Sequence, residues 1–191
     1  DSGAQLRSFE GNTQIVHSLS VCANGTHFIS GSYDRTVLLF DLAESAAVSA
    51  FTEHTDIVTT VAVFSDSQRF LSGSWDKTVR LWQSGAAQSE KVFVGHSDAV
   101  FSVSLCLDES FFLSAGGEFE GSDFTVRLWS VDSGLCIAEF DGHSNVVSCI
   151  AVLSDAERFV TGSEDETVRI WALSDCASGS DIDPAIGCKS D

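Results

Sequence analysis

The chain is built from four copies of one unit, with a period of about 42 residues. A polar residue recurs at spacings of 42, 42 and 47 residues, and we call its place the anchor position: Asn12, His54, His96 and His143. Each copy then carries, in the same order, a hydroxyl (Ser30, Ser72, Ser114, Thr161), an aspartate (Asp34, Asp76, Asp123, Asp165) and a closing aromatic (Phe40, Trp82, Trp129, Trp171). A unit repeated in phase buries its apolar face against the next copy, so the period itself constrains the fold.

Each copy predicts short antiparallel strands. In the second copy, residues 57–64 are β-branched and aromatic, residues 69–72 form a second strand, and residues 73–77 form a tight turn. Residues 78–82 alternate with the period of two that is typical of a strand, and residues 135–140 show the fourth strand before the next anchor. The sequence lacks convincing helical periodicity. Four antiparallel strands per copy predict an all-β fold made of propeller blades.

Two segments and two Gly-His pairs carry a resemblance to a known family. Residues 72–82 (SGSWDKTVRLW) and 161–171 (TGSEDETVRIW), with Gly95-His96 and Gly142-His143, resemble the WD40 repeat. The similarity extends over residues 4–173 and implies a β-propeller of four-stranded antiparallel blades, four of them in this chain. The expected blades are residues 10–51, 52–93, 94–140 and 141–173, with a strand at 4–9 that completes the last blade, followed by a polar, acidic tail at 174–191.

The resemblance also implies a hydrogen-bonded network within each blade. Its expected members are His54, Ser72, Asp76 and Trp82, then His96, Ser114, Asp123 and Trp129, then His143, Thr161, Asp165 and Trp171. The residue types suit this role, because a buried carboxylate needs hydrogen-bond donors and the imidazole and indole N–H groups can supply them. Asn12 and Phe40 break the pattern in the first copy, so we expect its blade to be the least stable. The third copy has five additional residues within 116–122, before Asp123.

The same residue types raise two other readings, a Ser-His-Asp hydrolase triad and a zinc site made by the three histidines. The set recurs in at least three copies, each time with a tryptophan, whereas a catalyst needs one set in a cleft. We therefore expect no catalytic residue, no metal ligand and no cofactor. The alternatives to an interaction scaffold are a propeller-fold enzyme of hydrolase type, for which only His17, His27 and residues 116–122 break the repeat, or a purely structural element of a larger assembly.

Two positions per copy are expected on one rim of the propeller, where the family commonly contacts peptides. One lies five residues after the anchor (His17, Thr59, Phe101, Ser148), and the other precedes the turn aspartate (Tyr33, Trp75, Ser122, Glu164). Trp75 is prominent, because exposed Trp and Tyr often anchor interfaces. With Tyr33 and Phe101 it would form an aromatic patch, beside Glu164, for a peptide that bears Lys or Arg. A structural reading, in which Trp75 packs on the neighbouring blade, is also open. Phe119, in the insertion, is a further candidate.

The net charge of −18 argues against direct binding of nucleic acid, whose phosphates would be repelled, and favours a basic protein or peptide. The acidic surface could equally serve solubility alone. No apolar run suits a membrane span. The six cysteines lack a C-x-x-C pair, and we expect structural thiols in an intracellular protein, cytoplasmic or nuclear. Because propellers hold about 4 to 8 blades, three arrangements remain open: a fragment of a longer propeller, a homodimer that forms an eight-bladed ring, or four blades that close alone.

Overall fold

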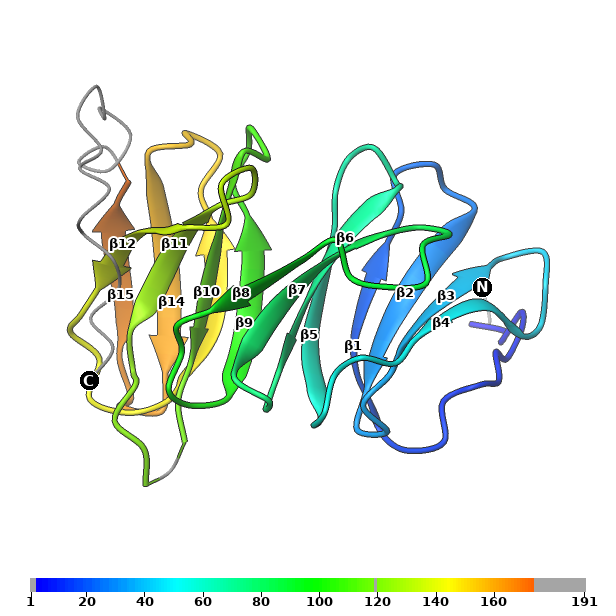
Figure 1. Ribbon diagram of the computed structural model, residues 1–191, viewed down its shortest axis with the longest axis horizontal. Coiled ribbons are helices and arrows are strands. Elements are labelled where there is room, and N and C mark those ends of the chain that lie inside the picture. Colours follow the sequence, from blue (N-terminus) through cyan, green and yellow to red (C-terminus); the bar gives the residue numbers. More distant parts are fainter. Residues whose placement is uncertain (1–2, 119, 174–191) are drawn as a thin grey trace.

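The computed structural model describes residues 3–118 and 120–173. These residues form four antiparallel sheets, blades 1 to 4, which stand side by side in chain order along an open arc (Figure 1). Blade 1 contains β1 (Val16–Val21), β2 (His27–Ser32), β3 (Val37–Asp41) and β4 (Ala47–Phe51), and blade 2 contains β5 (Val58–Val63), β6 (Arg69–Ser74), β7 (Thr78–Gln83) and β8 (Lys91–Val94). Blade 3 contains β9 (Val100–Leu105), β10 (Phe111–Gly116), β11 (Val126–Ser130) and β12 (Cys136–Phe140), and blade 4 contains β13 (Val147–Val152), β14 (Arg158–Ser163) and β15 (Val168–Ala172).

The all-β prediction is confirmed, and the strands predicted in the second and third copies match β5, β6, β7 and β12 to within two residues at each end. In blades 1 to 3 the four strands pair in chain order, each with the next. The part of the chain that the structure describes contains no helix long and apolar enough to cross a membrane.

The core lies between neighbouring blades. Phe51, at the end of β4, packs against Phe70 and Trp82 of the following blade, with ring centroids 4.8 and 5.4 Å apart. The next two junctions repeat this arrangement with Phe93 on Phe112 and Trp129, and with Phe140 on Phe159 and Trp171. Three buried clusters therefore follow one another, each shared by two blades, as the period predicts for units that cannot bury their apolar faces alone.

The first strand of every blade has a β-bulge at the same place. The register shifts between Val16 and Ser18 in β1 and between Val58 and Thr60 in β5. Blades 3 and 4 show it too, and the bulged residue is always the one five places after the anchor: His17, Thr59, Phe101 and Ser148. A bulge inserts one unpaired residue and re-aims its side chain, so this position is geometrically distinct in all four blades.

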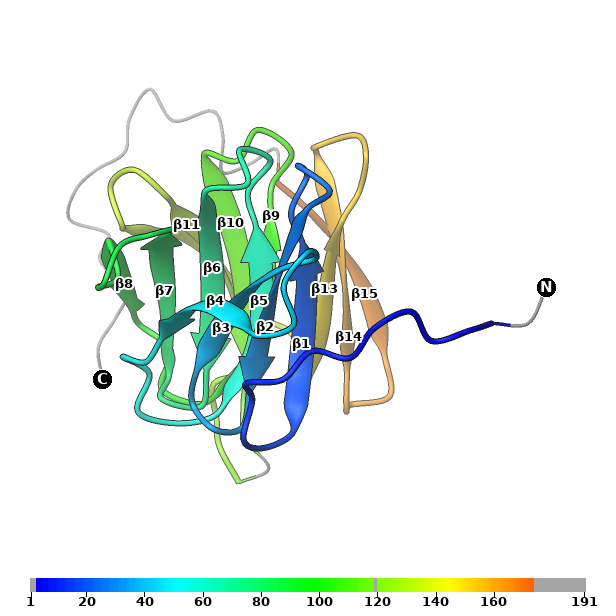
Figure 2. The same cartoon turned by 90° about the vertical axis from the view of Figure 1, so that its right-hand side faces the viewer.

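The segment 4–9 does not complete blade 4, which has three strands in the described part of the chain. Phe9 instead packs on Phe28 and Phe40 of blade 1, at 5.0 and 5.7 Å, as Phe51 does on blade 2. Leu6 is 97% exposed, and the first residues extend away from the sheets (Figure 2). The physical reason is distance, because blades 1 and 4 stand at opposite ends of the arc (Figure 1). The tail expected at 174–191 lies outside the described residues.

Candidate interaction surface

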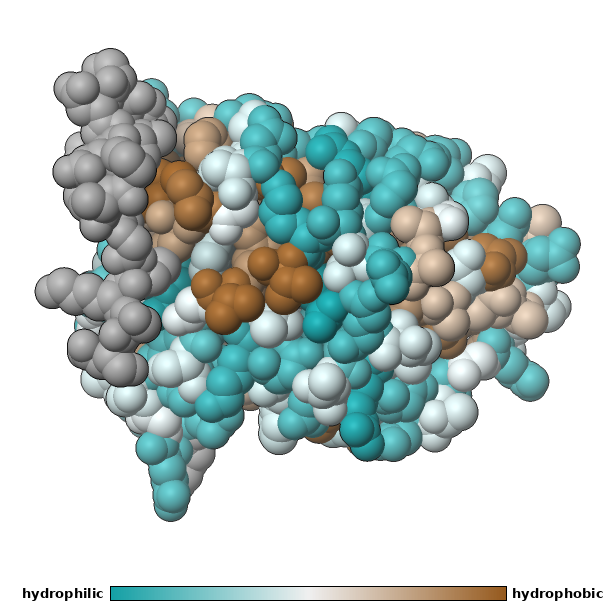
Figure 3. Space-filling model, viewed as in Figure 1, coloured by the Kyte–Doolittle hydropathy of each residue, from teal (hydrophilic) through white to brown (hydrophobic). Residues whose placement is uncertain are grey.

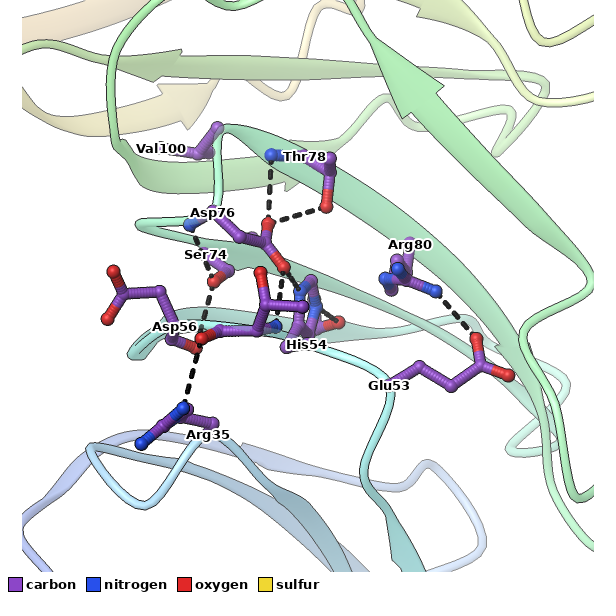
Figure 4. A network of polar contacts seen from close by, with 12 residues as sticks. Arg35, Glu53, His54, Asp56, Ser74, Asp76, Thr78, Arg80 and Val100 are labelled. Carbon is purple, nitrogen blue, oxygen red and sulfur yellow. Dashed lines mark hydrogen bonds and ion pairs between the residues drawn. The ribbon is translucent and has the colours of Figure 1, made fainter.

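A buried polar network ties the first loop of blade 2 to its inner strands (Figure 4). The His54 ring lies between Asp76, 2.7 Å from Nδ1, and the Ser72 hydroxyl, 2.6 Å from Nε2. The Trp82 indole N–H donates to the same hydroxyl at 2.8 Å. Burial alone would raise the pKa of Asp76, but hydrogen bonds from His54 and Thr78, and the positive charge that His54 can carry, outweigh it and hold that pKa far below its usual value.

Blades 3 and 4 contain the same arrangement. His96 lies 3.0 Å from Asp123 and 2.7 Å from Ser114, and His143 lies 2.7 Å from both Asp165 and Thr161. The indoles donate at 2.8 Å, from Trp129 to Ser114 and from Trp171 to Thr161. The three hydroxyls are buried beneath the indoles (Ser72, Ser114 and Thr161). These hydroxyls therefore lie out of reach of a substrate, and the sets hold loops to strands.

Blade 1 keeps part of this arrangement with different residues. Asn12 donates to the Ser30 hydroxyl at 3.1 Å, and Asp34 accepts the backbone N–H of Thr13 at 2.7 Å. Phe40 has no N–H to donate, and its ring stacks on Phe28 instead. Blade 1 therefore has fewer charge-assisted hydrogen bonds than the other blades.

Blade 3 adds an arginine to its network. Arg127 donates to both carboxylate oxygens of Asp123 at 2.7 Å and to Glu139 at 3.0 Å, and it lies 2.6 Å from Nδ1 of His96. Burial and the charge of Arg127 together lower the pKa of His96, although Asp123 opposes them. The pKa of Asp123 lies far below its usual value, because hydrogen bonds from His96, Thr125 and Arg127 outweigh the effect of burial. This site therefore favours a neutral imidazole beside an ionised carboxylate.

An aromatic pair crosses the junction between blades 2 and 3. Trp75 lies in the turn after β6, and its backbone N–H donates to the carbonyl of Ile57 at 2.9 Å, which fixes the turn. Its ring meets Phe101 edge-to-face, with centroids 6.1 Å apart and planes at 61°. Trp75 nevertheless remains 40% exposed. Trp75 therefore packs on the neighbouring blade, as the structural reading expected, and still presents indole surface to solvent.

A second pair lies on blade 1. The rings of His17 and Tyr33 stack with centroids 5.7 Å apart, and Nδ1 of His17 lies 2.8 Å from the carbonyl oxygen of Thr59. His17 is exposed and Tyr33 is half-buried. The N–H of Tyr33 donates to Ile15 as that of Trp75 donates to Ile57, so the two turns have the same anchoring contact and carry their aromatic rings at corresponding places.

Thr59 is a correction to the predicted set, because it is only 3% exposed. Its hydroxyl donates to the carbonyl of Gly73 at 3.1 Å and to that of Val100 in the next blade. The bulge turns this side chain toward blade 3, which covers it. Ser148 and Glu164, on blade 4, are both exposed. Phe119 lies outside the described residues.

Asp98 is a site residue that sequence reasoning missed. Its buried carboxylate accepts the N–H groups of Ser122 and Asp123, both at 2.8 Å, and so fixes the end of the inserted segment next to the network. A Cβ at Gly121 would collide with this carboxylate, so glycine permits the close approach. The only signal in the sequence is the insertion itself, because an additional loop needs partners for its backbone N–H groups.

Within residues 3–118 and 120–173, His, Cys, Asp and Glu form no cluster of three that could hold a metal.

Comparisons with known proteins agree with this geometry. The family described as "WD domain, G-beta repeat" (WD40) matches residues 3–41, 46–83, 87–130 and 134–172. A solved structure described as "Structure of U3-55K" is similar in fold, with a TM-score of 0.80 and 22% sequence identity over 90% of this chain and 53% of that chain. This chain therefore spans about half of that protein's length. No curated protein matches the chain. Four family matches, each with its strands and its polar contacts at corresponding positions, show that the chain belongs to the WD40 repeat family.

Proposed function

We propose that the chain is a non-enzymatic protein-interaction module that binds a basic peptide or protein on the rim formed by Trp75, Phe101 and Tyr33. The observation that carries the proposal is the Trp75–Phe101 pair, which is held in place across two blades and yet leaves 40% of Trp75 exposed. A tryptophan that is positioned by a neighbouring ring loses little conformational entropy when a partner covers it, and such residues dominate binding free energies.

Charge supports a basic partner. The net charge is −18, and Glu164 and Glu118 are exposed acidic side chains in turns of blades 4 and 3. The face seen in Figure 3 is mainly hydrophilic, with apolar residues confined to separate patches. A Lys or Arg side chain could approach the Trp75 ring by a cation–π contact while the surrounding charge steers the encounter. An acidic partner would meet repulsion at the same place.

The non-enzymatic part of the proposal rests on burial. A serine nucleophile must be reachable by the substrate carbonyl, next to donors that stabilise the oxyanion. Ser72 is fully buried, and its hydroxyl already contacts His54 and Trp82. The three sets are copies of one arrangement, so their residues are accounted for by holding the blades together.

A second proposal concerns the larger assembly, which we infer to be a propeller with more blades than these four. The residues of blade 4 that correspond to the buried Val79 and Leu81 of blade 2 are Val168 and Ile170, which are 78% and 59% exposed. Leu19 on the outer face of blade 1 is exposed as well, although its counterpart Val61 is buried. Exposed apolar faces of this kind mark interaction sites, and the match to about half of a longer WD40 protein supports the same reading.

The rim proposal is tested with a library of randomised peptides displayed on phage and selected on the immobilised chain. We expect enrichment of Lys and Arg beside an apolar residue, and we expect Trp75→Ala to weaken a selected peptide by about 30-fold, the effect of a typical hot spot. Leu135→Ala is the matched control, because Leu135 is exposed and lies in the turn before β12, away from the rim turns. Equal affinity in the Trp75 variant and the wild-type chain would rule out this rim as the binding surface.

A further inference from the structure

Each internal blade junction contains the same backbone-to-hydroxyl contact. The side-chain hydroxyl of the residue just after the bulge of one blade accepts a hydrogen bond from one backbone N–H in the first strand of the next blade. The three contacts are Ser18 with the N–H of Val61 at 3.1 Å, Thr60 with that of Val103 at 3.2 Å, and Ser102 with that of Ile150 at 3.1 Å. A hydroxyl at this place therefore satisfies a backbone donor that the neighbouring sheet leaves unpaired.

A cation adds a second contact at the first two junctions. Arg35 donates to the carbonyl of Thr55 at 3.3 Å (Figure 4), and Lys77 donates to that of Ser97 at 2.6 Å. Both residues directly follow the turn aspartate and have left-handed backbones, with φ of 71° and 70°. At the third junction Phe124 occupies this place and packs near Gly117 instead.

The open face of blade 4, which contains the exposed Val168 and Ile170, has different residues in place of both the hydroxyl and the cation. Cys149 follows the bulge of β13, where the other blades carry a hydroxyl, and it is exposed. Glu166 occupies the place of Arg35, with φ of 66° and an N–H that donates to Ser163 just as that of Arg35 donates to Ser32, both at 3.2 Å. Because the turn backbone is the same, the Cα–Cβ bond of Glu166 points in the same direction as that of Arg35 and Lys77.

The open face of blade 1 does not match these groups. By its position in the repeat it offers the N–H of Leu19 and the carbonyl of Thr13, the counterparts of Val61 and Thr55. A thiol is a weak acceptor for the first group, and a carboxylate cannot donate to the second. A junction between blade 4 and blade 1, from the same or a second copy, would therefore replace two favourable contacts with a weak one and a repulsive one.

We propose that the open face of blade 4 receives a propeller blade of different sequence from blade 1, which presents a basic side chain to Glu166, and that it discriminates against blade 1 of a second copy. Burial of Val168 and Ile170 would supply the apolar contact, as Val79 and Leu81 do at the junction between blades 2 and 3. The inference rests on the proposal that these blades belong to a larger propeller. A charge that a wrong partner would leave unpaired is a common means of excluding that partner.

The test gives the open face of blade 4 the residue types that the internal junctions carry. It then measures self-association of the chain by sedimentation velocity and light scattering. We expect the wild-type chain to have the mass of one copy. Glu166→Lys with Cys149→Ser should raise the association constant at least tenfold, because both internal contacts become possible with blade 1 of a second copy. Glu164→Lys is the matched control, because it makes the same charge change two residues away in the same turn. The backbone N–H of Glu164 donates to the carbonyl of Val146.

A charge reversal tests the chemistry of the partner directly. Thr13→Lys places a cation on blade 1, next to the carbonyl that would face Glu166, and should promote association of the otherwise wild-type chain. In the Glu166→Lys background the same substitution should suppress association, because two cations then meet.

Three results would overturn the inference: a wild-type chain that already forms dimers or larger rings, an equal effect of Glu164→Lys, or no change in sign with Thr13→Lys. A wild-type ring would still support a larger propeller while contradicting the discrimination. Binding of peptides at Trp75 is measured separately and does not depend on the outcome.

Discussion

The ring of Trp75 contacts that of Phe101 edge-to-face across the junction between blades 2 and 3, with centroids 6.1 Å apart. The contact joins the turn that follows β6 to the bulged residue of β9, two places that differ among the four copies. A pair of this geometry contributes about 0.5–1.5 kcal/mol beyond the area that it buries.

We expect Trp75→Ala and Phe101→Ala each to lower the free energy of unfolding by about 1 kcal/mol, and the double variant to lose less than the sum, because the pair is removed only once. Urea unfolding followed by circular dichroism measures all four chains. Additive losses would show that the two rings do not interact in solution.

The network of blade 2 should contribute more to stability than its counterpart in blade 1. Asp76 accepts hydrogen bonds from His54, Thr55 and Thr78, and its removal leaves buried donors unpaired, so Asp76→Ala should cost about 3 kcal/mol. Asp34→Ala should cost about 1 kcal/mol, since its donors are nearer the surface and no histidine faces it. Equal losses in chemical unfolding would contradict the ranking of the two blades.

Stability should fall as the pH is lowered. The folded-state pKa of Asp76 and of Asp123 lies below the ordinary value of 3.8, so their contribution is complete above that pH and is lost as the pH falls further. The pKa of His96 lies below 6.5, so the unfolded chain takes up its proton first, and stability begins to decline as the pH drops through 6.5. Thermal unfolding between about pH 7.5 and pH 2 should show both steps.

The upper step can be assigned to one residue. His96→Gln removes the titrating ring, so the decline that begins near pH 6.5 should shrink while the loss below pH 4 remains. The variant will be less stable at every pH, but the comparison uses the slope with pH and not the absolute value. An unchanged slope near pH 6.5 would assign that step to another histidine.

Phe9 is expected to stabilise blade 1 although the residues that precede it, 3–8, form no strand. It packs on Phe28 and Phe40 but is half-buried, so Phe9→Ala should cost about 1–2 kcal/mol. Phe51→Ala is the matched comparison, because Phe51 has the same place in the repeat and is fully buried, and its loss should be about 3–5 kcal/mol. No loss with Phe9→Ala would mean that the N-terminal segment is not held to blade 1.

The strand pattern was predictable because it depends on local spacing, and the polar networks were predictable because the repeat resembles the WD40 unit, which implies them. Residues 78–82 alternate with period two, and the spacing of His54, Ser72, Asp76 and Trp82 recurs unchanged in the fourth copy. The exposure of the rim positions was not predictable in the same way. Thr59 and Ser148 hold equivalent places in the repeat, but Thr59 is buried and Ser148 is exposed. Blade 3 covers the bulged residue of blade 2, whereas no blade follows blade 4 in the described part of the chain.

The sequence by itself determined how many repeats this chain contains, where their strands run and which side chains hold each blade together, since these follow from contacts within one repeat or between consecutive repeats. The tertiary structure decided the relationships that depend on how many blades stand in the arc. It left residues 4–9 away from blade 4, paired Trp75 with Phe101, and showed Cys149 and Glu166 on an open face. The reason is that each blade is completed by its neighbours, so the role of a residue depends on whether a neighbouring blade is present to contact it.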